Sequence, residues 1–227
     1  MTSLQQQAAT ATTRRTDLSR YAGIAYLVLF TAGFVIWTVG PRIYQGGSLD
    51  DYAAAFLDGS RTNQMSLVAY LLWPLAGVCL VWAVAHIAAC LDRVSGGTSL
   101  ARRLAMVGAV VMAVGFTVAA AASSAAAHVS SGTGEGFPAD PATGYGLDML
   151  ASQVQNVSAW GGSLVLLAVG IAARRTQLLP GWLLWAGIVI APLLPIAFLF
   201  GMLPLLAFML WLAAVGVMMK PSRVAAG

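Results

Sequence analysis

The chain carries very little charge. Only 9% of its 227 residues are Asp, Glu, Lys or Arg, whereas 59% are hydrophobic. Soluble domains carry about 25% charged residues, so this chain could not cover its surface in water. No charged residue lies inside any of its long apolar runs. The sequence therefore predicts a protein whose partner is mainly the lipid bilayer.

The missing charges also argue against several classes of function. Proton-coupled transporters, ion pumps and voltage sensors usually need charged groups within the membrane. The sequence contains no Walker A, HExxH, GxSxG or dinucleotide-binding motif, and we expect no cofactor. The net charge of +4 is spread between the apolar runs and forms no single patch. Nucleic acid is therefore not a predicted partner, because such spacing is typical of topology signals.

Cysteine is scarce too, since Cys79 and Cys90 are the only two. On one helix, eleven residues separate their Cα atoms by about 16 Å, and a disulfide needs about 7 Å or less. His86 falls on the same helical face, so His86 and Cys90 could supply two metal ligands. Zinc requires three or four, and no further His, Cys or intramembrane acid is at hand. We expect no metal site and interpret these side chains as packing.

What the chain does have is a series of apolar runs. One crossing takes about 20 residues, and the run 182–219 is long enough for two, divided at Gly201 and Pro204. The sequence therefore predicts an all-α, polytopic bundle of six transmembrane helices. The helical domain covers 21–219, between a flexible tail at 1–20 and a second tail at 220–227, with spans near 21–39, 65–91, 104–128, 150–173, 182–200 and 203–219. Pro74, Pro192 and Pro195 are expected to kink spans two and five.

The basic residues predict an orientation. With the N-terminus in the cytoplasm, ten of the twelve Lys and Arg fall inside, and only Arg42 and Arg61 fall outside. This bias is typical of inner loops, so we expect both termini in the cytoplasm. Eleven Arg against one Lys in an Ala- and Gly-rich chain are typical of a high-GC bacterium. The predicted location is therefore a bacterial plasma membrane.

The two longest predicted outer loops differ in character. In loop 41–64, Ser48 and Asp51 have the spacing of a capping box. Apolar side chains then recur on one helical face, at Leu49, Tyr52, Ala53, Phe56 and Leu57. This pattern predicts a short amphipathic helix lying on the outer surface. Loop 129–149 contains Gly, Pro and Ser but no Lys or Arg, and is predicted to be irregular.

A polar stripe marks the outer half of span four. At 100° per residue, its five side chains fall within about 100° of one another: Ser152, Gln153, Asn156, Trp160 and Ser163. Amides in hydrocarbon lack hydrogen-bond partners, so we expect this stripe to face the bundle interior. Two interpretations remain open, a ligand-binding cleft open to the outside and simple hydrogen bonding between helices.

Span three ends in a run of small residues, 118–127, followed by His128. Small side chains let helices approach closely, so this span is the expected neighbour of the stripe. Ser124 and His128 are four residues apart and share a face. We therefore include both as candidate ligand-binding residues, with the alternative that His128 is only solvated.

Two segments carry a resemblance to a known family. One is Arg20-Tyr21-Ala22-Gly23-Ile24-Ala25-Tyr26-Leu27, and the other is Arg174-Arg175-Thr176-Gln177-Leu178-Leu179-Pro180-Gly181-Trp182-Leu183. Together with the length and the six predicted spans, they resemble a bacterial integral membrane family known only as a domain of unknown function. The resemblance covers most of the chain and implies no activity or catalytic residue.

Three functions are compatible with these observations. The first is a non-enzymatic membrane protein that binds a small apolar ligand or a membrane-protein partner through the outward-facing stripe. The second is a membrane-embedded enzyme acting on an isoprenoid or lipid, with His128, Gln153 and Asn156 in an outward cleft. The third is a facilitator for a neutral solute. No catalytic residue is assigned from the sequence.

Overall fold

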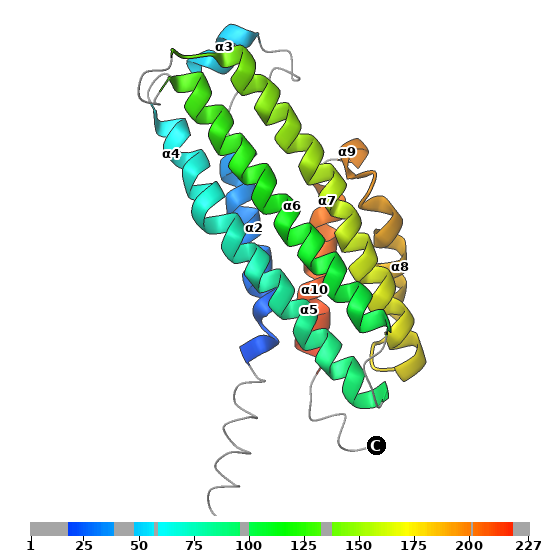
Figure 1. The fold of residues 1–227 in the computed structure, drawn as a ribbon. Coiled ribbons are helices and arrows are strands. Elements are labelled where there is room, and N and C mark those ends of the chain that lie inside the picture. The colour runs from blue at the N-terminus through cyan, green and yellow to red at the C-terminus, as the bar shows by residue number, and fades with distance from the viewer. Residues whose placement is uncertain are drawn as a thin grey trace, which may run out of the picture.

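A computed structural model describes residues 18–38, 48–56, 59–95, 100–132, 138–200 and 202–219. Within these ranges all regular structure is helical, which confirms the predicted all-α class (Figure 1). The elements are α2 (Ala22–Thr38), α3 (Leu49–Ala54), α4 (Ser60–Leu67), the π-helix η2 (Val68–Leu72), α5 (Trp73–Ser95), α6 (Leu100–Ser131), α7 (Pro141–Thr176), α8 (Gly181–Leu193), α9 (Ala197–Phe200) and α10 (Leu203–Met218).

Three continuous helical segments are long and apolar enough to cross a membrane. They are Ser60–Arg93, Leu100–Ser131 and Pro141–Thr176, which supports the prediction of a membrane protein. The apolar helices α2, α8 and α10 are shorter, with 17, 13 and 16 residues. Thirteen helical residues cover about 20 Å, less than the hydrocarbon core of about 30 Å. The six-span topology therefore stays a prediction.

The long helices form the front of the bundle in Figure 1. There α5, α6 and α7 run side by side, α2 and α10 lie behind them, and α8 follows the edge of α7. Helices α6 and α7 pack most closely, because glycines face each other across the contact. A Cβ atom on Gly161 would collide with the carbonyl oxygen of Gly108, and one on Gly115 would collide with the Ser158 hydroxyl.

An aromatic cluster ties α2, α5 and α6 together at the centre. The rings of Phe30 and Trp73 stack with centroids 5.2 Å apart and an interplanar angle of 3°. Phe116 meets Phe30 edge-on at 4.7 Å. All three side chains are almost fully buried. Such pairs add about 0.5–1.5 kcal/mol beyond their burial, so this cluster is a major element of the packed core.

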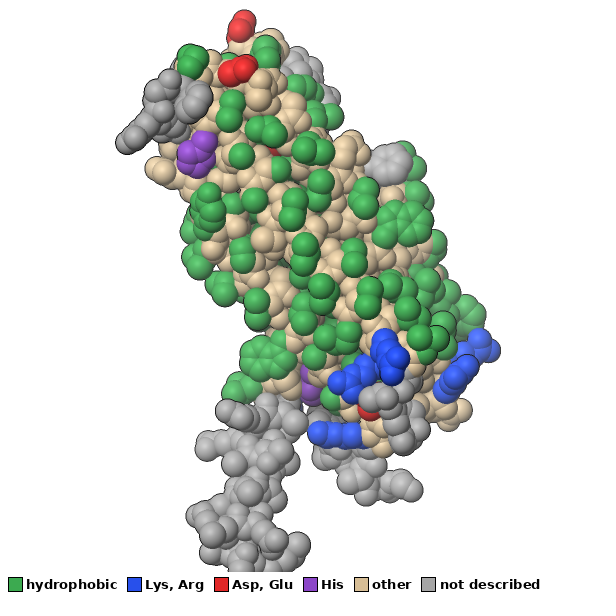
Figure 2. All heavy atoms as spheres, in the orientation of Figure 1, with side chains coloured by type: hydrophobic (Ala, Val, Ile, Leu, Met, Phe, Trp, Pro, Cys, Tyr) green, Lys and Arg blue, Asp and Glu red, His purple; other side chains and the backbone are tan. Residues whose placement is uncertain are grey.

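Charged side chains separate to the two ends of the bundle. Figure 2 shows Arg side chains at the end where α5 stops, α6 starts and α7 stops, and Asp side chains at the opposite end. Asp92 lies among the arginines as the partner of Arg102. We call the first the basic end, defined by Arg93, Arg102, Arg103, Arg174 and Arg175, and the second the acidic end, which carries Asp50, Asp51 and Asp140. This segregation is what antiparallel spans with alternating loop charge produce. Which end faces the cytoplasm stays a prediction.

Two segments differ from the sequence prediction. Where an irregular loop was expected over 129–149, α6 continues to Ser131 and α7 already starts at Pro141. The Asp140 carboxylate accepts a 3.1 Å hydrogen bond from the Thr143 backbone N–H, so Asp140 and Pro141 form an N-cap and first-turn pair that promotes an earlier start. In the expected span 182–200, the helix breaks between α8 and α9. Pro195 lies in this break, where it cannot donate a helical hydrogen bond.

The short helix expected after Ser48 is confirmed as α3, with its capping box. The Ser48 backbone N–H donates to the Asp51 carboxylate at 2.8 Å, and the Asp51 N–H donates to the Ser48 hydroxyl at 3.1 Å. Two residues of the predicted apolar face, Tyr52 and Phe56, are buried against Met65 and Ala127. Leu49 is 43% exposed, and Leu57 lies outside the described residues. Helix α3 therefore closes the acidic end of the bundle.

Candidate functional site

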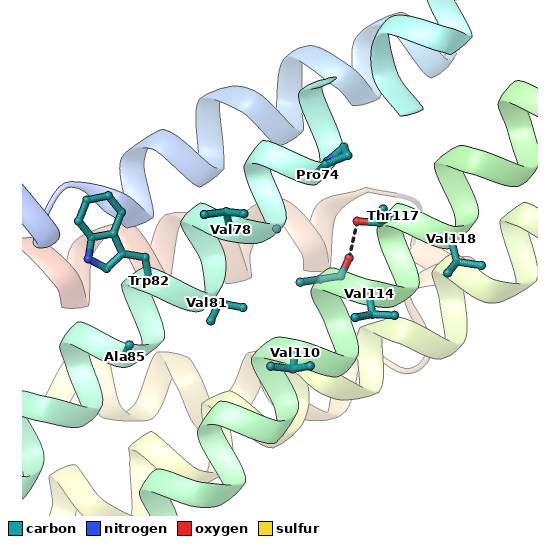
Figure 3. Close-up of a pocket in the computed structure, with 11 residues that line it drawn as sticks. Pro74, Val78, Val81, Trp82, Ala85, Val110, Val114, Thr117 and Val118 are labelled. Carbon is teal, nitrogen blue, oxygen red and sulfur yellow. Dashed lines mark hydrogen bonds between the residues drawn. The ribbon is translucent and has the colours of Figure 1, made fainter. Parts of the chain in front are cut away.

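One concave site is a groove between α5 and α6. It has a volume of about 550 Å³, within the usual range of ligand pockets. Figure 3 shows that α5 and α6 supply its opposite walls. The lining residues are Pro74, Gly77, Val78, Val81, Trp82 and Ala85 from α5, and Val110, Ala113, Val114, Thr117 and Val118 from α6. We call this surface the α5/α6 groove.

The end of the groove at Pro74 follows an irregular stretch of helix. Residues Val68–Leu72 form a π-helix immediately before Trp73 and Pro74. Proline removes one backbone donor, and a π-turn widens the helix, so the two features belong together. Three residues further on, an added Cβ on Gly77 would lie 3.2 Å from the Ala113 Cβ. This contact brings the two backbones together and forms the floor of the groove.

The chemistry of the α5/α6 groove is almost purely apolar. The Thr117 hydroxyl donates a 2.8 Å hydrogen bond to the carbonyl of Ala113, on its own helix (Figure 3). It is therefore satisfied without a ligand. Four of the five valines in the two walls are exposed, among them Val78 at 63% and Val114 at 55%, and Val81 is half-buried. A hydrocarbon fits such a surface, whereas a ligand that needs several hydrogen bonds does not.

A second groove lies on the other side of the same α6 ridge, between α6 and α7. It has a volume of about 530 Å³, and Val110 and Val114 line both grooves. Gln153 and Val157 contribute its α7 wall. The polar side chains that line the second groove are Gln153, from the predicted stripe, and Ser158. The Ser158 hydroxyl already donates a 2.6 Å hydrogen bond to the carbonyl of Val154.

The predicted inward stripe on α7 is wrong for two of its five residues. Gln153 is exposed, and Trp160 is 62% exposed on the outside of the bundle. Ser152 and Asn156 are half-buried. Only Ser163 is buried, and its hydroxyl donates a 2.7 Å hydrogen bond to the carbonyl of Ala191 on α8. That bond is an interhelical contact of the kind expected for packing.

The inward face of α7 is centred on Gln155 instead. At 100° per residue from Ser152, Gln155 lies near 300° and Trp160 near 80°. Buried small residues share the Gln155 face, namely Ala151, Ala159 and Gly162. Close approach to α6 and α8 requires small side chains, and this requirement decided the rotation of the helix. Polarity alone was a poor guide to it.

A hydrogen-bond chain near the acidic end was not found from the sequence. The Trp37 indole N–H donates to the Ser123 hydroxyl oxygen at 2.9 Å, and that hydroxyl donates to the Asp148 carboxylate at 2.9 Å. These two hydrogen bonds join α2, α6 and α7. Asp148 falls within the loop expected over 129–149, but α7 starts at Pro141 and carries this residue on a helix. The Asp140-Pro141 start signal is the sequence feature that indicates this.

Arg61 closes the same region from α4. Its guanidinium donates to the carbonyls of Ile36 and Trp37 at 2.6 and 2.7 Å, near the end of α2 where helical carbonyls lack internal partners. Burial and the negative charge of Asp148 raise the pKa of the Tyr52 hydroxyl on α3, partly offset by Ser130 and Arg61. Tyr52 therefore stays protonated and acts as a neutral packing group.

The residues of the predicted enzymatic cleft do not come together. The His128 Nδ1 lies 2.8 Å from the carbonyl of Ser124, one turn earlier on α6, so this ring is bonded to its own helix. Gly144 of α7 lies level with His128, because a Cβ atom on Gly144 would meet Ala126 and Ser130 of α6. Gln153 lies nine residues further along α7, about 14 Å away. Ser124 is buried, with its hydroxyl 3.4 Å from that of Ser66.

His86 and Cys90 lie toward the basic end, whereas Cys79 lies eleven residues before Cys90 on α5. The His86 Nδ1 is 2.7 Å from the Ser19 hydroxyl, and the Cys90 sulfur is 3.9 Å from Nε2. Both cysteines are free thiols. No group of three or more His, Cys, Asp or Glu that could hold a metal occurs in the described ranges. His86 therefore links the segment before α2 to α5.

Comparison with known proteins gives no further constraint. No protein-family model, no curated protein and no solved structure matches the chain. The resemblance noted from the two arginine-containing segments therefore stays a prediction.

Proposed function

We propose that this protein is a membrane protein that binds a hydrocarbon chain in the α5/α6 groove. The observation that carries the proposal is the groove itself, about 550 Å³ in volume, with exposed valine walls and its one hydroxyl already satisfied. From Pro74 to Ala85 the groove follows eleven residues, or about 16 Å of helix. That length is about half of the hydrocarbon core, which suits one leg of a lipid or an isoprenoid chain.

A lipid chain fits this groove better than a helix of another protein. Interfaces between membrane helices are rich in small residues that let the backbones approach, and in polar side chains that hydrogen-bond across. Here the small residues Gly77 and Ala113 are already used in the contact between α5 and α6. The walls carry branched valines, and Thr117 is bonded to its own helix. A flexible chain can fill the space that such rigid side chains leave.

The test uses a substitution that fills the α5/α6 groove and leaves the buried core residues unchanged. Val78→Trp places a large ring at a position that is 63% exposed and lines the α5/α6 groove but not the second groove. Ile171→Trp makes a matched change on α7 at a position that is 56% exposed. Detergent-purified protein is analysed by native mass spectrometry for co-purified lipid. We expect bound lipid in the wild type and in Ile171→Trp, and much less in Val78→Trp. Equal retention by all three proteins would refute the proposal.

A further inference from the structure

Along α6, the side of the α5/α6 groove leads toward the basic end. Arg103 lies seven residues before Val110, and Thr117 lies seven residues after it. Seven residues are nearly two helical turns, so these three side chains share one stripe of α6, with Arg103 about 10 Å beyond the groove. Val110 and Thr117 both line the groove, and Arg103 is exposed.

The neighbouring Arg102 has a different role. Its guanidinium donates a 2.7 Å hydrogen bond to the Asp92 carboxylate on α5, forming an ion pair across the two helices. Asp92 lies seven residues after Ala85, the last α5 residue of the groove. The ion pair therefore closes the space between α5 and α6 below the groove. Among the described residues of the basic end, Asp92 is the only carboxylate, so it offsets one of several positive charges.

Two further features favour an anion beside Arg103. Helix α6 begins at Leu100, so the backbone N–H groups of its first turn and the positive end of its dipole lie at this level. On α5, Arg93 lies eleven residues after Trp82, which places the two side chains within about 20° on the helix. Arg93 and Trp82 thus border the same opening from the α5 side, and both are exposed.

We infer that the ligand of the α5/α6 groove is an anionic phospholipid, whose acyl chain fills the groove and whose phosphate is bound by Arg103 at the start of α6. This inference rests on the proposed function and names its ligand class. The separation of about 10 Å between Arg103 and Val110 leaves room for the glycerol part of the lipid. Arginine suits this task, because its planar group binds phosphate through two parallel hydrogen bonds.

The competing explanation is a general attraction between a basic protein surface and anionic lipid. The chain offers a control for it. Arg174 and Arg175 end α7 at the same basic end and are also exposed, but no residue of α7 lines the α5/α6 groove. General attraction would depend equally on Arg103 and Arg175. A built site would depend on Arg103 alone.

The experiment compares two lipids with identical acyl chains, phosphatidylglycerol and phosphatidylcholine. Full-length protein and the variants Arg103→Gln, Arg175→Gln and Val78→Trp are titrated with each lipid in detergent, and bound lipid is counted by native mass spectrometry. We expect the wild type and Arg175→Gln to prefer phosphatidylglycerol. Arg103→Gln should lose about fivefold in affinity for it, the usual effect of one basic residue. Millimolar inorganic phosphate should displace little lipid, whereas full displacement would identify a free-phosphate site and overturn the inference.

The phospholipid assignment and the hydrocarbon-binding groove can be refuted separately. Equal losses in Arg103→Gln and Arg175→Gln, or no headgroup preference in the wild type, would overturn the assignment of an anionic phospholipid bound at Arg103. In that case, loss of both lipids from Val78→Trp would still support the α5/α6 groove as the site of the hydrocarbon chain. Undiminished binding of both lipids by Val78→Trp would refute the groove as the site. Each variant changes an exposed side chain, and a retained thermal transition checks that it folds.

Discussion

The indole N–H of Trp37 on α2 donates a 2.9 Å hydrogen bond to the hydroxyl oxygen of Ser123 on α6. Because the Ser123 hydroxyl donates in turn to Asp148, one small side chain links three helices near the acidic end. Polar contacts in the interior of a membrane protein contribute modestly to stability, but removing a shared partner leaves two groups affected. This geometry makes Ser123 a sensitive position.

Ser123→Ala is expected to destabilise the protein by about 1–3 kcal/mol, because Trp37 and Asp148 each lose one hydrogen-bond partner. Ser152→Ala is the matched control. Its hydroxyl donates at 3.1 Å to the Asp148 carbonyl of its own helix, and that carbonyl stays in the helical ladder. Thermal unfolding in detergent measures both. A shift in Tm no larger for Ser123→Ala than for Ser152→Ala would contradict the proposed link.

The contact between α6 and α7 gives a second prediction. Gly161→Ala should destabilise by about 1–3 kcal/mol, because its methyl group would push the two backbones apart. Gly170 has no atom within 4 Å of its Cβ position. Gly170→Ala should therefore be neutral or stabilise by up to about 1 kcal/mol, since alanine favours the helix. Equal Tm values for the two variants would show that α6 and α7 are not held this closely.

The helical class and α3 could be predicted from the sequence, because composition and capping act locally. The rotation of α7 could not. The amide of Gln153 and the indole of Trp160 suggested an inward stripe, but backbone approach at Gly108 and Gly161 turned Gln155 inward. The α5/α6 groove was missed for a related reason. Of the residues that shape the groove, the sequence singles out only Pro74, as a helix kink. The contact between Gly77 and Ala113 depends on the register between two helices, which local sequence does not specify.

Acid should loosen α3. Hydrogen bonds from the backbone and side chain of Ser48 lower the pKa of the Asp51 carboxyl below its ordinary value of 3.8. A lowered pKa in the folded state stabilises α3 above pH 3.8, and this contribution is lost as the pH falls through the folded value. The amides of residues 49–54 should therefore be less protected from hydrogen exchange in acid, relative to their intrinsic exchange rates at the same pH. Asp51→Asn should remove most of this dependence, and an unchanged pH profile in that variant would contradict it.

The residues around His86 allow a test of the packing interpretation. His86→Ala removes a buried ring and the 2.7 Å contact with Ser19, so we expect a loss of about 2 kcal/mol or more. The double variant Cys79→Ala and Cys90→Ala should lose less than this, because thiols pack as small apolar groups. Metal analysis of the purified wild type should detect no stoichiometric zinc. Stoichiometric zinc that disappears in the double variant would overturn the packing interpretation.

Photolabelling by a lipid with a diazirine in its acyl chain tests directly whether the α5/α6 groove binds a hydrocarbon chain. The purified protein is irradiated in lipid nanodiscs, digested and mapped by mass spectrometry. We expect the labels to be concentrated on Val78, Trp82 and Val114 in the α5/α6 groove. Other exposed apolar positions, such as Ile171 and Leu199, should be labelled weakly, although they are 56% and 65% exposed. Labelling that simply follows exposure, with these positions equal to the groove, would contradict the claim.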